Sequence, residues 1–175
     1  TGLRQAKLLA SRLRDSNATI YSSDLKRASE TASFLSEKIE LRTTLREINV
    51  GDFTGMPVGQ TYSSNNEIFQ SLQDDSYQFP NGETVKEFKQ RVNNELEYIF
   101  RNIENGSEAI VITHGFFIGT AIGLSIGFNH YPFPIGNIEN TSISTLIKRD
   151  SITQVNKFND SLHLSELNID FPRET

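Results

Sequence analysis

Residues 110–115 have the sequence Ile-Val-Ile-Thr-His-Gly, in which a β-branched apolar run ends in a histidine and a glycine. An apolar stretch with helical character follows directly. This order is typical of a buried strand that carries His114 to the edge of an open α/β sheet, where such sheets bind their ligands. The sequence therefore predicts an α/β fold with a candidate site residue at position 114.

A second strand-to-helix junction lies in residues 22–32, Ser-Ser-Asp-Leu-Lys-Arg-Ala-Ser-Glu-Thr-Ala. It follows a short predicted strand at residues 19–21 and opens a predicted helix, with Ser23 or Asp24 as the expected N-cap. Arg27 then falls about one turn into that helix. A histidine at one junction and an arginine at the other are what a phosphate pocket without a metal requires.

The composition limits the size and the partners of the protein. Its 175 residues suit one compact domain, which we assign to residues 1–175. The net charge of −5 argues against a nucleic-acid partner, and the absence of cysteine excludes disulfides, thiol nucleophiles and cysteine-ligated zinc. No apolar run approaches the roughly 18 residues that span a bilayer. We expect a cytoplasmic protein without a membrane partner, and its oligomeric state stays open.

Hydrophobic periodicity predicts alternating helices and strands. The expected helices cover residues 3–13, 25–35, 85–103 and 116–126, with a further short helix within 62–72, and the expected strands cover 19–21, 109–113, 141–147 and 152–158. Thr84 and Glu87 form a predicted capping box at the start of the helix at 85–103. The polar tail after Leu164 is expected to lie on the surface.

Three residues are candidates for the chemistry, and each has a plainer structural alternative. His114 suits anion binding together with the helix N-terminus at Gly115 and Phe116, but a histidine there can also form local hydrogen bonds only. Arg27 suits a phosphate, although arginines are common on exposed helix faces. Glu47 could protonate a leaving alkoxide if burial or anionic neighbours raise its pKa, whereas a lone loop glutamate is usually solvated.

The other two histidines, His130 and His163, are expected in surface or packing roles. No histidine pair has metal-ligand spacing. The sequence contains neither a nucleophile elbow nor the glycine-rich loops that bind dinucleotides or nucleoside triphosphates. We therefore expect no metal and no cofactor.

Further motifs extend along nearly the whole chain. They are Thr1-Gly2-Leu3-Arg4-Gln5-Ala6, the glycine-containing loop from Leu45 through Glu47 to Gly55, Pro80-Asn81-Gly82-Glu83-Thr84 with Phe88 and Arg91-Val92, and Asn140-Thr141-Ser142-Ile143. Together with residues 22–32 and 113–115, these motifs resemble the histidine phosphatase superfamily, the phosphoglycerate mutase-like proteins. The motif of residues 22–32 is the most specific of them after the family signature.

This resemblance implies a three-layer α/β/α sandwich with a mostly parallel sheet. It also implies a metal-independent phosphatase that acts through a phosphohistidine on a small phosphorylated metabolite, with a phosphate ester or inorganic phosphate as ligand. Arg27 and His114 would bind the phosphate, and Glu47 would be the proton donor. Residues 51–80 would form the substrate lid. A phosphoglycerate mutase-type transfer stays open as an alternative, as does a non-catalytic pseudoenzyme or phospho-ligand-binding module.

One part of the family pattern is not in the sequence. The family signature is an N-terminal strand that ends in Arg-His-Gly, whose histidine is the covalent nucleophile, and no histidine of this chain matches it by motif. The resemblance implies that this strand would precede Thr1, in a segment of about 25–35 residues, and lie near the middle of the sheet. Without it we expect an open gap beside residues 109–113 and an inactive protein.

Overall fold

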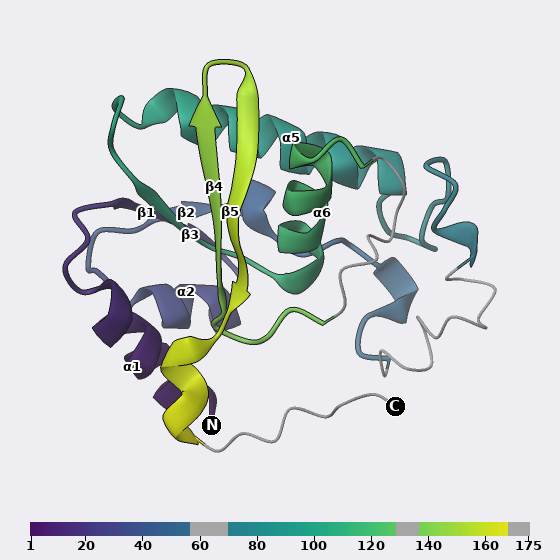
Figure 1. The fold of residues 1–175 in the computed structure, drawn as a ribbon. Coiled ribbons are helices and arrows are strands. Elements are labelled where there is room, and N and C mark those ends of the chain that lie inside the picture. The colour runs from purple at the N-terminus through teal and green to yellow at the C-terminus, as the bar shows by residue number, and fades with distance from the viewer. Residues whose placement is uncertain (57–69, 129–136, 168–175) are drawn as a thin grey trace.

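The computed structural model describes residues 1–56, 70–128 and 137–167. Within these ranges the strands and helices form a mixed α/β fold (Figure 1). None of the helices described there is both long and apolar enough to cross a membrane. The short helix expected within residues 62–72 lies mostly outside the described residues, and so does His130.

A parallel sheet of three strands forms the centre of the fold. β1 (Thr19–Ser23) lies between β2 (Glu40–Arg42) and β3 (Ala109–Ile112). Tyr21, in the middle of β1, pairs with one residue of each neighbouring strand. Because all three strands are parallel, their carboxyl ends meet at one edge of the sheet, where α/β proteins bind their ligands.

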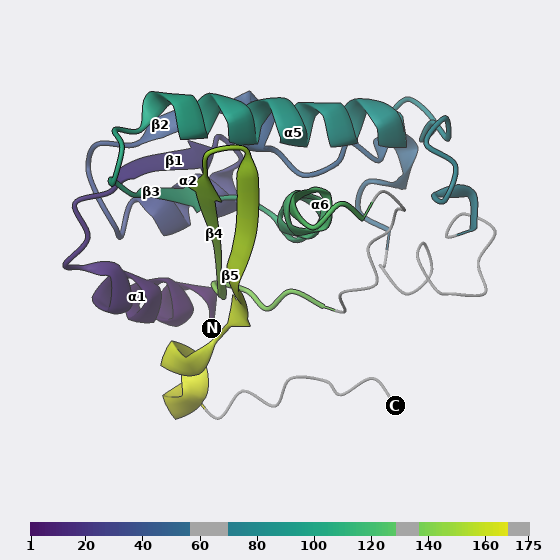
Figure 2. The same ribbon diagram turned by 45° about the horizontal axis from the view of Figure 1, so that its top comes forward.

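Helices cover both faces of this sheet. α5 (Val85–Asn102) lies along one face, whereas α1 (Gly2–Leu13) and α2 (Lys26–Ala32) lie on the other (Figure 2). α6 (Gly115–Ser125) follows β3 and packs against α5. This arrangement confirms the predicted α/β/α layering with parallel strands.

α5 begins at the predicted capping box. The Thr84 side chain accepts the backbone N–H of Glu87, and the Glu87 carboxylate accepts the backbone N–H of Thr84. The apolar face of α5 packs into the core and includes Val85, Phe88, Val92 and Ile99. Burying each such side chain contributes about 1.5–3 kcal/mol, so this face holds the helix firmly on the sheet.

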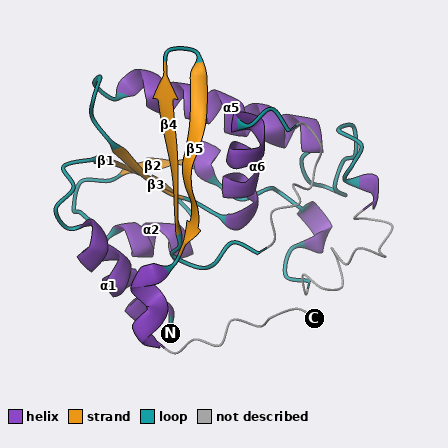
Figure 3. Ribbon diagram, in the orientation of Figure 1, coloured by secondary structure: helices purple, strands orange, loops and turns teal. Residues whose placement is uncertain are grey.

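A two-stranded antiparallel hairpin stands beside the central sheet. β4 (Ile143–Arg149) and β5 (Ile152–Asp160) pair with each other through a two-residue turn (Figure 3). Among the described strands, β3 pairs with β1 alone. A cleft of about 1130 Å³, which α6 also lines, separates β3 from β4. Within the described part of the chain, the gap expected beside residues 109–113 is therefore open.

The strands that border this cleft are less shielded than the strand at the sheet centre. Four of the five residues of β1 are buried, whereas every residue of β3 and all but the last of β4 are only partly buried. The free edge of β3 also presents backbone N–H and C=O groups that have no sheet partner among the described strands.

Two details of the sheet and of α2 differ from the prediction. β2 was not predicted, because it is three residues long and its Glu40 and Leu41 are exposed, so it has no apolar alternation. The predicted N-cap of α2 is wrong. The helix begins at Lys26 with Leu25 in the cap position and has no side-chain cap, so neither Ser23 nor Asp24 caps it.

Three short 3-10 turns complete the described chain, namely η1 (Thr43–Leu45), η2 (Gly51–Phe53) and η3 (Leu162–Leu167). η3 packs against α1 and buries Leu164. The chain therefore keeps a regular turn as far as Leu167, slightly beyond the point where the sequence predicts a surface tail.

Two glycines allow two distant backbone segments to touch. Gly51 has a φ of +53°, and a Cβ atom there would lie 1.9 Å from the carbonyl oxygen of Pro80. A Cβ atom at Gly82 would lie 2.3 Å from the carbonyl oxygen of Asn49. The N–H of Asp52 donates to the Pro80 carbonyl at 2.9 Å. Only glycine fits at both positions, and the two segments are closed against each other.

Candidate active site

The three predicted site residues line one pocket at the carboxyl edge of the sheet. Arg27 comes from α2, Glu47 from the loop after η1, and His114 from the end of β3. All three border a pocket of about 590 Å³, and Gly115 borders it as well. The parallel strands thus bring together residues that lie far apart in the sequence.

His114 is buried and hydrogen-bonded through both ring nitrogens. The His114 residue is only 7% exposed to solvent. Arg27 Nε lies 3.2 Å from Nδ1, and Ser23 Oγ lies 2.9 Å from Nε2. Because a guanidinium can only donate, Nδ1 must accept and the ring proton must sit on Nε2, which donates to Ser23.

The surroundings of His114 favour the neutral imidazole. Burial, followed by the positive charges of Arg27 and Arg91, lowers the pKa of His114 to about 4. The ring is therefore uncharged at neutral pH in this state. A bound phosphate dianion would bring negative charge beside the ring and favour its protonation. Nδ1 would then donate to the phosphate in place of accepting from Arg27.

Ser23 is a site residue that the sequence did not single out. It is the last residue of β1 and is fully buried. Its hydroxyl accepts the N–H of Leu25 and contacts His114, so it links the start of α2 to the histidine. The available signal was its place at the end of a strand next to the Arg27 motif, which was interpreted instead as a possible helix cap.

Arg27 lies at the pocket with an exposed side chain. It is the second residue of α2, one position closer to the helix start than the sequence suggests. Asp24, the other expected cap, instead forms an ion pair with Arg46. That pair lowers the pKa of Asp24 and leaves the Arg27 guanidinium as the cation that faces the pocket.

Glu47 caps the N-terminus of α6. Its carboxylate accepts the backbone N–H groups of Ile48, Phe116 and Phe117 at 3.1–3.2 Å. Burial raises the pKa of Glu47, and these three hydrogen bonds oppose the shift without cancelling it. The Phe116 N–H, which the sequence assigned to phosphate, donates to Glu47 in this structure, so a phosphate would have to share or displace that bond.

The loop that carries Glu47 is also attached to β3. The Thr113 hydroxyl, beside His114, donates to the carbonyl of Leu45 at 2.7 Å. The proton-transfer candidate and the histidine are therefore held in one rigid unit at the end of the sheet.

His163 lies away from these contacts. Its Nδ1 lies 3.2 Å from Arg12 Nη1, and Arg12 forms an ion pair with Asp160, so the cluster joins α1 to the end of β5. Burial lowers the pKa of His163. In the part of the chain that the structure describes, no three His, Cys, Asp or Glu side chains are grouped as a metal site.

Comparison with known sequences matches this chain to one family. The family described as "Histidine phosphatase superfamily (branch 1)" matches residues 1–161. A metal-independent phosphoserine phosphatase of Arabidopsis thaliana is 31% identical over 177 residues, which cover 95% of this chain and 72% of the relative. A probable phosphoglycerate mutase, GpmB, of Photorhabdus laumondii is 28% identical over 151 residues, covering 82% of this chain and 70% of the relative.

Comparison with solved structures matches the fold. The mycobacterial glucosyl-3-phosphoglycerate phosphatase, solved in complex with inorganic phosphate, superposes with a TM-score of 0.76. The match covers 93% of this chain and 86% of that structure, at 23% sequence identity. At this identity the comparison shows a shared fold.

Proposed function

This chain belongs to the histidine phosphatase superfamily, branch 1, and we propose that it is a metal-independent phosphomonoesterase that acts through a phosphohistidine on small phosphate esters. One observation carries this proposal. Arg27, Glu47 and His114 lie in a single pocket, where they supply a fixed cation, a proton donor and a switchable imidazole. A cytoplasmic location remains a prediction.

Phosphate binding is assigned to Arg27 and His114. The Arg27 guanidinium faces the pocket from the start of α2, and its planar fork matches two oxygens of a phosphate. Protonation of His114 would end the contact in which Nδ1 accepts from Arg27, and both groups would then donate to the phosphate. These two groups would stabilise the charge that spreads over the equatorial oxygens in the transition state.

The nucleophile is assigned to the Arg-His-Gly segment that the resemblance places before Thr1. Its strand would occupy the cleft between β3 and β4 and carry its histidine toward the pocket, because that cleft adjoins the free edge of β3. Two buried hydroxyls just before β4, Thr141 Oγ1 and Ser142 Oγ, have no hydrogen-bond partner among the described residues. Both residues border the cleft or the pocket, where a polar segment would satisfy them.

The reaction would proceed in two displacements. A histidine nitrogen forms a bond to phosphorus while the bond to the ester oxygen breaks, and protonated Glu47 gives its proton to the departing alkoxide. Water then attacks phosphorus, the P–N bond breaks, and Glu47 accepts the proton of the water. The raised pKa of Glu47 suits this cycle, because the group must hold a proton at the first step.

A phosphoglycerate mutase-type transfer is the second candidate. It is favoured by the similarity to the probable mutase of Photorhabdus laumondii. In that reaction the phosphoryl group returns to another hydroxyl of the substrate instead of passing to water. Isomerisation of 3-phosphoglycerate without phosphate release would therefore replace the phosphatase proposal.

The proposal is tested with the gene product that includes the residues before Thr1. It should release phosphate from p-nitrophenyl phosphate and from a panel that contains phosphoserine and sugar phosphates. The rate should be unchanged by EDTA, and a rapid acid-free quench should trap a phosphorylated histidine detectable by mass spectrometry. Loss of activity in EDTA that a divalent cation restores would contradict the proposal, and no activity on any ester would favour a pseudoenzyme or binding module.

A further inference from the structure

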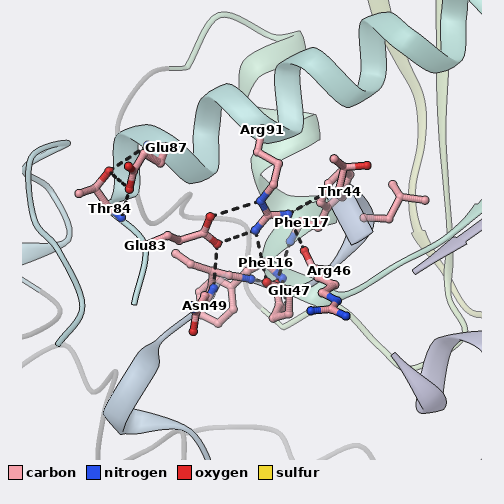
Figure 4. A network of polar contacts seen from close by, with 12 residues as sticks. Thr44, Arg46, Glu47, Asn49, Glu83, Thr84, Glu87, Arg91, Phe116 and Phe117 are labelled. Carbon is pink, nitrogen blue, oxygen red and sulfur yellow. Dashed lines mark hydrogen bonds and ion pairs between the residues drawn. The ribbon is translucent and has the colours of Figure 1, made fainter. Parts of the chain in front are cut away.

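Arg91, in the middle of α5, holds the loop that carries Glu47 (Figure 4). We infer that Arg91 and Glu83 form a brace that positions Glu47 for proton transfer. This role rests on the proposed function of Glu47. The described lining of the pocket includes neither Arg91 nor Glu83, so both would act through Glu47 and not on the substrate.

One side of the Arg91 guanidinium donates hydrogen bonds to three backbone carbonyls of the loop. Arg91 Nη1 donates to Thr44 at 2.9 Å and to Arg46 at 2.8 Å, and Nη2 donates to Glu47 at 3.3 Å. Two of these carbonyls precede Glu47 in the chain, and the third belongs to Glu47 itself. A guanidinium has five donors in a fixed plane, whereas a lysine ammonium cannot span three acceptors in this geometry.

The other side of Arg91 binds Glu83, which continues the brace past Glu47. The Glu83 carboxylate accepts from Arg91 Nε and Nη2. It also accepts the N–H of Asn49 at 2.8 Å, and the Glu83 N–H donates to the Asn49 carbonyl at 3.0 Å. The backbone on both sides of Glu47 is therefore attached to one ion pair.

The brace complements the contacts of the Glu47 side chain. The carboxylate is held by N–H groups of Phe116 and Phe117 at the start of α6, while its backbone is held by Arg91. Two attachments fix both ends of the side chain, and catalytic geometry is sensitive to displacements of about 1 Å. A loosened loop would let Glu47 leave the buried position that raises its pKa.

A purely structural role has different consequences. The side chains of Arg91 and Glu83 are 20% and 16% exposed, so breaking this partly buried pair weakens hydrogen bonds that water only partly replaces and lowers stability. A loss of stability would lower the rate of hydrolysis of every substrate by the same factor. Misplacement of Glu47 would instead slow only those substrates whose leaving group needs a proton.

The test uses the protein with the residues that precede Thr1 and compares two substrates. Arg91→Lys keeps the charge and removes the fork, and Glu83→Gln keeps the shape and removes the charge. We expect Arg91→Lys to lower kcat/KM about 10-fold for an alkyl phosphate and less than about 3-fold for p-nitrophenyl phosphate. In a Glu47→Gln background, Arg91→Lys should cause no further selective loss, because both changes remove the same proton transfer.

Glu95→Gln is the matched control. Glu95 lies one turn after Arg91 on α5, is 3% exposed and pairs with Arg42. The substitution breaks an arginine pair of the same helix that is at least as buried, and Glu95 makes none of the Glu47 contacts described above. It should lower the Tm while leaving the ratio of alkyl to aryl activity unchanged.

A second measurement does not depend on activity. Carbon-13 NMR titration of the Glu47 carboxyl should show its pKa falling toward the ordinary value in Arg91→Lys, because burial is the main cause of the raised pKa. Equal losses on both substrates, or an unchanged Glu47 titration, would overturn the brace. If the wild-type protein hydrolyses neither substrate, the proposed function fails, and the titration alone decides whether Arg91 positions Glu47.

Discussion

β1 and β3 are neighbouring strands of one sheet, yet they differ in how many strands pair with them and in how deeply they are buried. β1 pairs on both sides and is almost entirely buried, whereas β3 pairs on one side and faces a cleft with the other. The β1 side of the pocket has a full set of contacts, from Ser23 and Arg27 to the braced loop of Glu47. The open side has the partly buried residues of β3, and the Thr141 and Ser142 hydroxyls before β4 have no hydrogen-bond partner among the described residues.

The two regions would serve different parts of the proposed reaction, namely phosphate binding with proton transfer and the supply of the nucleophile. The groups proposed to bind phosphate and move protons meet at the carboxyl edge of the sheet, where Arg27 follows β1, Glu47 follows β2 and His114 follows β3. The open side is where a further strand would fit, and it is also where the proposed nucleophile would enter.

The largest effect should come from the open side. Residues 1–175 expressed by themselves should release no phosphate and should unfold without a sharp transition, because an unpaired central edge costs about 1–3 kcal/mol for each buried unsatisfied group against a total margin of roughly 5–15 kcal/mol. Calorimetry and a phosphate-release assay check this. A cooperative transition in an inert protein would refute the need for another strand, and activity would make His114, His130 or His163 the nucleophile.

The next largest effect concerns the two residues proposed to bind phosphate. Arg27→Ala and His114→Ala, each in the protein that includes the leading residues, should lower kcat/KM at least about 100-fold, or roughly 2.7 kcal/mol, on every substrate. His130→Ala should change it little, because no motif assigns that histidine a role. Steady-state kinetics decide the matter, and equal losses at positions 114 and 130 would mean that the wrong histidine has been placed in the pocket.

Glu47→Gln should have a selective effect. Alkyl phosphates, whose oxygen departs only with a proton, should lose about 100-fold in kcat, while aryl phosphates should lose much less. The measurement is the dependence of kcat on the pKa of the leaving group. Similar losses across the series would assign Glu47 a positioning role and move the proton donor elsewhere.

The last prediction concerns stability and pH, and it involves no change in turnover. His114 binds a proton near pH 4 in the folded protein and near pH 6.5 in an unfolded chain. Between these values the unfolded chain binds more protons, so the free energy of unfolding should decrease as the pH falls from about 6.5 to 4, by up to about 3 kcal/mol. Urea titrations of wild type and His114→Gln should differ in slope over this window. Equal slopes would show that His114 is not buried in its neutral form.

The parts of the fold that the sequence predicted are those with local signals. The capping box at Thr84 is set by neighbouring residues, and the apolar run before His114 has no competing interpretation. β2 was missed because an exposed edge strand of three residues has no period to detect. The Arg27–His114 contact was anticipated only through the rule that parallel strand ends converge.

The supporting residues of the site were harder to predict for a physical reason. In the sequence, Arg91 looks like any arginine on an amphipathic helix. Its proposed role depends on the backbone carbonyls of Thr44, Arg46 and Glu47, which lie more than 40 residues earlier in the chain. The Glu47 carboxylate accepts backbone N–H groups at the start of α6, where the sequence predicted that phosphate would bind. Such contacts are made by backbone groups, which every residue carries, so side-chain patterns do not reveal them.

The contact between Gly51 and Gly82 has an evolutionary consequence. It joins the two ends of residues 53–79 independently of what lies between, because backbone touches backbone there and the Asp52 N–H binds the Pro80 carbonyl. Once the ends are joined, doubling the length of such a loop costs only about 0.6 kcal/mol in closure entropy. Insertions and deletions that keep the buried residues Leu72 and Phe79 in place thus cost little in folding free energy. Selection can remodel its length and sequence to accept new esters while the machinery that breaks the P–O bond is inherited unchanged.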